Sequence, residues 1–182
     1  MVYVHFAEGF EEIEALTIVD ILRRGEVEIQ TVSIAGSRQV TGAHQVTVSA
    51  DLLFEEADYG ACEMLVLPGG LPGAYNLRDH EGLAEEARRF AAQGKYLAAI
   101  CAAPLALARY GVLTGKKAVI YPGMEDQLAD AVYENSPLVT DGRMITSQGP
   151  ATAMLFALAL VQTLKGKQAA DQVAAGLLWT RK

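Results

Sequence analysis

Cys101 has the sequence setting of a reactive thiol. It stands between a strand-like run, residues 96–100, and a helix that we expect to begin near Pro104. The residues two positions away, Ala99 and Ala103, are small, as the tight strand-to-helix turn of a nucleophile elbow requires. The N-terminal end of that helix should lower the thiol pKa and favour a thiolate. The same residues also fit a buried structural cysteine at a strand end.

Glu14 is the second candidate for chemistry. On a helical wheel of ~100° per residue it shares an apolar stripe with Ile18 and Ile21. Glu12 lies ~160° away on the same wheel, so we expect it to face solvent. A carboxyl on an apolar stripe is costly to ionise, so Glu14 should have a raised pKa and could exchange a proton with a nearby sulfur. A partly exposed acid, or a cap partner in the first helical turn, is the alternative.

A glycine-rich loop at residues 68–73, Pro-Gly-Gly-Leu-Pro-Gly, follows a buried strand. It lacks the Lys-Ser/Thr pair of a P-loop and the G-x-G-x-x-G order of a dinucleotide fingerprint, so it does not predict a nucleotide site. The backbone N–H groups of Gly69 and Gly70 could instead form an oxyanion pocket beside a nucleophile on the neighbouring strand. A plain tight turn is the alternative.

The three histidines and the second cysteine show no comparable pattern. His5 falls inside the first strand, His44 in a hairpin region and His80 at the start of a surface helix, so we expect each to be structural or solvated. Cys62 precedes a core strand and is expected to be an ordinary buried cysteine. Because no cluster of histidine, cysteine and carboxylate residues has metal-ligand spacing, we predict no metal site.

The composition limits the class of protein. A length of 182 residues predicts a single domain, 1–182, and 51% hydrophobic residues are enough to enclose a core. The net charge of -7 argues against nucleic acid as a partner. The longest apolar stretch, residues 151–164, is shorter than the ~20 residues that cross a bilayer, and no signal sequence is evident. We therefore expect a cytoplasmic protein with free thiols and no membrane span.

Strand-like and helical patterns alternate along the chain. The expected strands are residues 2–6, 27–34, 64–67, 96–100, 118–120 and 144–147, with a hairpin at 39–41 and 45–50. The expected helices are residues 11–24, 79–92, 104–110 and 125–131, a long apolar helix ending near 164, and 168–178. This order predicts a three-layer α/β/α sandwich with a mostly parallel sheet and a small edge hairpin. Chemistry in such folds gathers beyond the carboxyl ends of the strands, where Cys101 and the 68–73 loop lie.

Five motifs give the chain a family resemblance. They stand at residues 8–14, 19–24, 67–77, 99–104 and 146–150 and read EGFEEIE, VDILRR, LPGGLPGAYNL, AICAAP and TSQGP. Over essentially its whole length the chain resembles the ThiJ/PfpI superfamily, in its DJ-one/YajL branch. The resemblance implies a flavodoxin-like fold, a homodimer and a reaction that requires no cofactor.

The resemblance also implies roles for individual residues. The family's elbow cysteine would be Cys101, its protonated glutamate Glu14, and the N–H groups of Gly70 and Ala102 would hold an oxyanion or a sulfinate, with Gly69 beside them. The implied activity is that of a glutathione-independent glyoxalase or a deglycase, acting on a small reactive aldehyde such as methylglyoxal or on a glycated adduct. A redox-sensing or chaperone-like protein of oxidative stress, which uses oxidation of Cys101, is the alternative.

Four positions depart from the family pattern. Tyr121 stands where the branch commonly has a histidine, and a phenol is a poor base at neutral pH, so base catalysis would fall on Glu14. Ala102 stands where the PfpI branch has a histidine, which argues against peptidase activity. His44 and Gln148 stand where some relatives have arginines.

Overall fold

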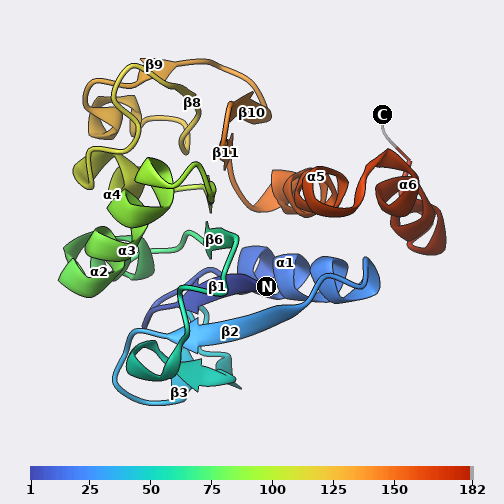
Figure 1. The fold of residues 1–182 in the computed structure, drawn as a ribbon, viewed down its shortest axis with the longest axis horizontal. Coiled ribbons are helices and arrows are strands. Elements are labelled where there is room, and N and C mark those ends of the chain that lie inside the picture. Colours follow the sequence, from blue (N-terminus) through green and yellow to red (C-terminus); the bar gives the residue numbers. More distant parts are fainter. Residues whose placement is uncertain (181–182) are drawn as a thin grey trace.

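A seven-stranded sheet forms the centre of the molecule (Figure 1). The computed structural model describes residues 1–180, so residues 181 and 182 of the predicted domain lie outside the described chain. Neighbouring strands are parallel except for the antiparallel pair β10 and β11 at one edge. In order across the sheet, the strands are β10 (Leu138–Asp141), β11 (Met144–Ser147), β7 (Tyr96–Ile100), β6 (Met64–Leu67), β1 (Val2–Phe6), β2 (Ile29–Ser33) and β5 (Leu52–Leu53).

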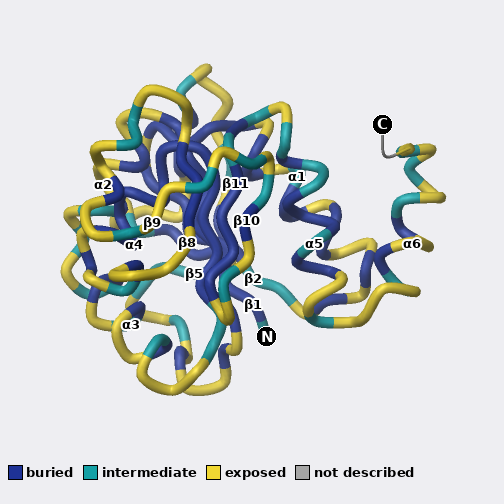
Figure 2. Tube along the Cα trace, turned by 90° about the horizontal axis from the view of Figure 1, so that it is seen from above, coloured by how far each residue is buried: buried dark blue, intermediate teal, exposed yellow. Residues whose placement is uncertain are grey.

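Helices cover both faces of this sheet (Figure 2). On one side lie α1 (Glu12–Arg24), α5 (Ala153–Lys165) and α6 (Lys167–Gly176), and α5 packs against both of the others. On the other side lie α2 (Gly73–Asp79), α3 (Glu81–Ala92) and α4 (Pro104–Arg109). The predicted three-layer α/β/α sandwich with a mostly parallel sheet is therefore confirmed. Across the described residues, none of the helices is both long and apolar enough to span a membrane.

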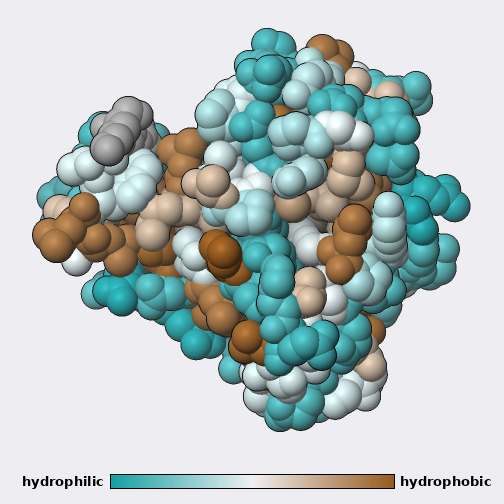
Figure 3. Space-filling model, turned by 180° about the vertical axis from the view of Figure 1, so that it is seen from behind, coloured by the Kyte–Doolittle hydropathy of each residue, from teal (hydrophilic) through white to brown (hydrophobic). Residues whose placement is uncertain are grey.

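Hydrophobic side chains also reach the surface on one face. Seen from behind, they run from the lobe of the C-terminal helices onto the neighbouring body of the molecule (Figure 3). The large hydrophobic side chains that are exposed include Ile13 and Leu16 on α1. An exposed apolar area of this kind is typical of a surface that meets a partner.

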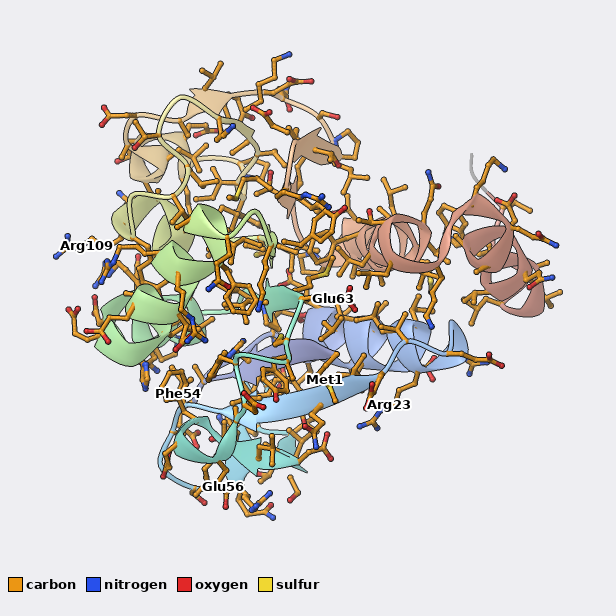
Figure 4. All side chains as sticks on the ribbon, in the orientation of Figure 1. Met1, Arg23, Phe54, Glu56, Glu63 and Arg109 are labelled. Atoms are coloured by element: carbon orange, nitrogen blue, oxygen red, sulfur yellow. The ribbon has the colours of Figure 1, made fainter. Side chains whose placement is uncertain are left out.

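The local sequence explains the central strands and the first helix. β1 and β6 are buried throughout, as expected of unbroken apolar runs in a parallel sheet covered on both faces. An ion pair of 3.3 Å between the amino group of Met1 and the carboxylate of Glu63 joins the starts of these two strands (Figure 4). α1 begins after Glu11, whose carboxylate accepts the N–H of Glu14, and it ends at Gly25.

The predicted hairpin forms a small sheet of its own. Among the described residues, β3 (Gln39–Thr41) and β4 (Thr47–Ser49) pair only with each other, in antiparallel register. The hairpin is held against the loop after β1, because the N–H of Gly9 donates to the carbonyl of Thr41 and the N–H of Ala43 donates to that of Phe10. The hairpin turn is thereby brought to the carboxyl end of β1.

The strands of the second half differ from the sequence prediction. The expected strand 118–120 is β8 (Lys117–Ala118), which pairs with β9 (Val132–Tyr133) outside the central sheet. The edge position next to β11 is taken by β10, for which the sequence pattern contains no distinct apolar run. Pairing between distant segments decides these positions, and the alternation of residues within one segment does not report it.

Two predicted helices also differ. The expected helix 125–131 is a 3-10 turn, Glu125–Leu128, which stops where Ala129 takes a positive φ. The expected helix 79–92 is divided at His80, whose ring nitrogen accepts a backbone N–H and caps the start of α3. The other 3-10 turns are Phe54–Glu56 and Pro150–Thr152.

Candidate active site

Cys101 lies on a tight turn between β7 and α4. Its φ of 61° is in the left-handed region, which costs a residue with a side chain about 1–3 kcal/mol and is found chiefly at functional sites. The turn is held on both sides, since the N–H of Cys101 donates to the carbonyl of Ser147 at 2.9 Å and its own carbonyl accepts the N–H of Tyr121 at 2.8 Å. Ala99 and Ala103 are both fully buried at the turn. This geometry matches the elbow that their small side chains predict.

The turn opens onto a cavity of about 280 Å³. Its walls come from the loop after β1, the hairpin turn, the loop after β6, the elbow, and the segments that follow β8 and β11. The lining residues are Glu11, Ala43, His44, Gly70, Leu71, Cys101, Ala102, Tyr121, Met124 and Pro150. A larger groove of about 380 Å³, between the end of α1 and α6, contains no cysteine or histidine. The cavity at Cys101 thus has a candidate nucleophile in its wall.

Glu14 is buried directly behind Cys101. Its side chain has 0% exposed surface, and one carboxyl oxygen, Oε2, accepts the N–H of Gly69 at 2.8 Å. The other oxygen, Oε1, has no hydrogen-bond partner within residues 1–180. A Cβ atom on Gly69 would lie 2.6 Å from Cβ of Cys101 and 2.8 Å from Oε2 of Glu14, so a glycine is needed where the two side chains meet. Gly69, predicted as an oxyanion contact, thus holds the carboxyl of Glu14.

Burial controls the proton affinity of both groups. It raises the pKa of the Glu14 carboxyl to about 7, against the smaller effect of the hydrogen bond from Gly69. Burial, followed by the charge of Glu14, raises the pKa of the Cys101 thiol to about 12. The expected net lowering of the thiol pKa is not found: backbone N–H groups at the elbow do act to lower it, but burial and the neighbouring carboxylate outweigh them. Once the pH has risen through about 7, the pair carries one negative charge and one proton that sulfur and carboxyl can exchange.

Two backbone donors lie close to the sulfur of Cys101. The N–H groups of Ala102 and Gly70 act to lower the pKa of the thiol. Gly70 adopts a φ of 92°, and a Cβ atom there would collide with the backbone at Glu11, so only glycine brings this N–H so close. An oxyanion hole likewise presents backbone N–H donors beside a nucleophile.

Tyr121 lies on the wall of the same cavity. Gly149 lies between Tyr121 and Cys101. A Cβ atom on Gly149 would stand 3.3 Å from the ring of Tyr121 and 4.0 Å from the sulfur of Cys101. About half of the side chain is exposed, and its hydroxyl has no hydrogen bond within the described chain. The structure therefore brings Tyr121 beside Cys101, where its phenol can donate a hydrogen bond.

Glu12 and His44 were missed by the sequence pattern. The helical wheel predicts that Glu12 faces solvent, but Glu12 is buried because the hairpin covers that side of α1. Its carboxylate accepts the backbone N–H of His44 at 2.6 Å, the ring Nδ1 of His44 at 2.8 Å and the N–H of Val46 at 3.4 Å. The contact joins residues 32 positions apart, so no local signal could reveal it.

The Glu12–His44 contact also explains a cluster of donor atoms. Atoms of Glu11, Glu12 and His44 lie within 4.8 Å of one another. Hydrogen bonds to His44 and Val46 account for the position of the Glu12 carboxylate, so we interpret the cluster as a hydrogen-bonded contact that fixes the hairpin. Its consequence is that His44 stands on the wall of the Cys101 cavity.

Fold and site together define a class of protein. A flavodoxin-like α/β sandwich carries a cysteine on a strained elbow, two backbone donors and a buried carboxyl at the carboxyl edge of its sheet. The chain belongs to the DJ-1/PfpI family, whose model matches residues 1–163.

Individual relatives agree with this assignment. The chain is 35% identical over 178 residues to Protein DJ-1 homolog B of Arabidopsis thaliana. This match covers 97% of the chain but only 41% of that protein. It is also 32% identical over 161 residues to a protein of Pyrococcus abyssi named a deglycase. That match covers 87% of the chain and 96% of the relative. The structure of oxidized Toxoplasma gondii DJ-1 has a TM-score of 0.95 at 37% identity and covers 99% of this chain and 98% of that one. These similarities support a DJ-1-like function.

Proposed function

We propose that this protein is a cysteine-dependent, glutathione-independent glyoxalase or deglycase-like enzyme that acts on small 2-oxoaldehydes such as methylglyoxal. One observation carries the proposal. The sulfur of Cys101 faces a small cavity with two N–H donors on one side and the buried carboxyl of Glu14 on the other. A nucleophile, an oxyanion site and a proton carrier are the parts that such a reaction requires.

The first step is addition to the aldehyde. The thiol proton of Cys101 passes to Glu14 as the sulfur forms a bond to the aldehyde carbon. The C=O electron pair moves to oxygen, where the N–H groups of Gly70 and Ala102 stabilise the charge. Glu14 then returns the proton to this oxygen, which leaves a hemithioacetal on the cysteine and a carboxylate at Glu14.

The second step moves hydrogen between adjacent carbons. The Glu14 carboxylate removes the proton from the former aldehyde carbon, and the electron pair forms an enediolate with the neighbouring carbonyl. Glu14 delivers this proton to the second carbon while the hydroxyl proton moves between the two oxygens. The product is a thioester of a 2-hydroxy acid on Cys101, which water cleaves to the free acid and the thiol. A pKa of about 7 suits Glu14 to both halves of this transfer.

The proposed substrate class has support from a relative. A protein named a deglycase shares 32% identity with 87% of this chain, which favours a reactive aldehyde or a glycated adduct as the substrate. The scheme uses only side chains and backbone groups of the chain and requires no cofactor. The mismatch with a PfpI-type peptidase at Ala102 is a further reason to prefer carbonyl chemistry.

A redox sensor is the second candidate, and the same geometry supports it. Each of two peroxide molecules would transfer an oxygen atom to the sulfur of Cys101 and leave as water, giving a sulfinate. The N–H groups of Gly70 and Ala102 and a protonated Glu14 could then donate hydrogen bonds to the sulfinate oxygens. One similar structure is described as oxidized DJ-1.

We also propose that residues 1–182 form one domain that pairs with a second copy in the cytoplasm. Exposed Ile13 and Leu16 on α1 and exposed Val46 in the hairpin could meet such a copy beside the cavity. Analytical ultracentrifugation of the wild type and of Leu16→Glu tests the pairing. We expect a dimer that the charged variant converts to a monomer, and a monomeric wild type would contradict the pairing.

Turnover of methylglyoxal in the absence of glutathione tests the proposed enzyme. We expect lactate from the wild type and from Cys62→Ser, and a loss of at least ~10³-fold in Cys101→Ser because the covalent route is removed. Equal rates in the wild type and Cys101→Ser would exclude the mechanism. Negligible turnover, together with selective gain of two oxygens at Cys101 after mild peroxide treatment, would favour the sensor.

A further inference from the structure

We propose that His44 is the general base that activates water to release the product from Cys101. This inference rests on the proposed function and assigns its last step, the cleavage of the thioester. The hairpin turn, far from the elbow in sequence, brings this histidine to the same cavity as the nucleophile.

Glu14 is badly placed for the water step. It lies behind Cys101 with 0% exposed surface, and one of its oxygens is held by the N–H of Gly69. It can therefore exchange protons with atoms bonded to the sulfur, but solvent water does not reach it directly. Hydrolysis needs an acceptor that faces both the cavity and the solvent.

His44 meets that requirement. His44 lines the cavity, and its side chain is 72% exposed, so the ring is accessible to solvent water. The contact of 2.8 Å between Nδ1 and the Glu12 carboxylate favours the tautomer with the proton on Nδ1, which leaves the lone pair on Nε2. Nε2 has no hydrogen-bond partner within residues 1–180. A carboxylate that orients an imidazole in this way is the arrangement used by general-base histidines.

Contacts between the hairpin and Glu12 fix the position of the imidazole. The buried carboxylate of Glu12 also accepts the backbone N–H groups of His44 and Val46. A Cβ atom on Gly42 would overlap the carboxylate of Glu12, so the hairpin backbone packs directly against it. The position of His44 is thus determined by a buried group, although its ring is exposed.

The chemical step balances with these groups. The water oxygen bonds to the thioester carbon as its proton moves to Nε2 of His44. The bond between that carbon and the sulfur of Cys101 then breaks, the sulfur takes the electron pair, and the proton on the imidazole returns to the sulfur. The free 2-hydroxy acid leaves, and the thiol and the neutral histidine are restored.

The pH dependence of this step follows from the groups that face His44. These are the carboxylates of Glu11 and Glu12, the Cys101–Glu14 pair across the cavity, and the phenol of Tyr121. The hydrogen bond and charge of Glu12 raise the pKa of His44 above its usual value. Because the base is the neutral form, hydrolysis should speed up as the pH rises through that pKa. Glu12→Gln removes this charge, so the rate of hydrolysis should increase at a lower pH than in the wild type.

Pre-steady-state kinetics with methylglyoxal tests the role of His44. In His44→Gln we expect a burst in which about one equivalent of methylglyoxal is consumed. Lactate should then form at a steady rate ~10²-fold below that of the wild type. Intact-mass analysis should show a lactoyl group on Cys101 that the wild type does not accumulate. Alkylation of Cys101 by iodoacetamide should be unchanged, because His44 acts after the nucleophilic step. The control is His80→Asn, which keeps a capping side chain at α3 and should match the wild type.

The outcomes separate this inference from the proposed function. If the wild type turns over methylglyoxal and His44→Gln matches it without a trapped adduct, the role of His44 is refuted and the proposed function stands. If the wild type forms neither lactate nor an adduct, the proposed function fails, and the role of His44 fails with it. If the pH profile of thioester hydrolysis is the same in Glu12→Gln as in the wild type, the part assigned to the Glu12–His44 pair is refuted.

Discussion

The two cysteines of this chain are both buried, yet their surroundings differ in kind. Cys62 has 1% exposed surface, and its thiol donates to the carbonyl of Met64 at 3.2 Å. Cys101 has 8% exposed surface at a cavity, and the backbone N–H groups of Ala102 and Gly70 act to lower the pKa of its thiol. Burial raises the pKa of both thiols, to about 11 for Cys62 and about 12 for Cys101. Ease of losing a proton to water therefore does not distinguish them.

The difference lies in where the proton can go. The thiol of Cys62 gives its hydrogen bond to a carbonyl oxygen, which cannot accept the proton at neutral pH. The thiol of Cys101 stands beside Glu14, a carboxyl that accepts a proton near pH 7. A buried cysteine thus becomes a nucleophile when a partner takes its proton and fixed donors receive the charge. The predictions below test this contrast.

Among the tests of this contrast, removal of the proton acceptor should have the largest effect. Glu14→Gln keeps the size of the side chain but cannot exchange the thiol proton, so kcat/KM for methylglyoxal should fall by ~10²-fold or more. The rate of lactate formation at several methylglyoxal concentrations measures kcat/KM. The control is Glu134→Gln, since Glu134 is exposed and pairs with Lys117 away from the cavity. A Glu14→Gln enzyme within a factor of about two of the wild type would remove the distinction between the two cysteines.

The buried carboxyl should also make stability depend on pH. The pKa of Glu14 is raised from 4.5 to about 7 in the folded chain, so the folded state binds this proton more tightly than the unfolded state. The resulting stability is fully present below pH 4.5 and is lost as the pH rises through about 7, and it amounts to about 3 kcal/mol. Urea unfolding at pH 5 and pH 8 should show this loss in the wild type. Glu14→Gln should lack it, and parallel profiles would contradict the raised pKa.

Alkylation rates should separate the two thiols directly. At pH 8 both thiols are mainly protonated, but the Glu14 carboxylate can take the Cys101 proton as the sulfur reacts, so iodoacetamide should label Cys101 at least ~10-fold faster than Cys62. Labelling of Cys101 should rise near pH 7, and this rise should vanish in Glu14→Gln. Peptide mass spectrometry over a pH series measures both sites in one sample. Equal labelling of both cysteines would count against the proposed nucleophile.

The smallest effect should come from Cys62 itself. Cys62→Ala removes a buried sulfur and one hydrogen bond to Met64, so the free energy of unfolding should fall by about 1 kcal/mol. Turnover of methylglyoxal should not change, because Cys62 does not line the cavity. Thermal unfolding and lactate formation check both expectations. A clear loss of turnover would show that Cys62 influences the site.

Much of the fold could be predicted because its signals are local. The central strands and α1, α4 and α5 follow from apolar runs and from caps within a few residues. The departures occur where pairing between distant segments decides the outcome. β8 leaves the central sheet to pair with β9, and β10 takes the edge beside β11.

The chain by itself determined which residues stand on the elbow, since small neighbours and a strand-to-helix junction are properties of a short segment. It also determined that Glu14 faces inward, because an apolar stripe on one helix is a local pattern. Tertiary structure decided the rest. It covered Glu12 with the hairpin, placed His44 on the cavity wall and reversed the expected direction of the Cys101 pKa. Burial and the charge of a neighbour depend on which distant segments surround a group, and that is settled only when the chain has folded.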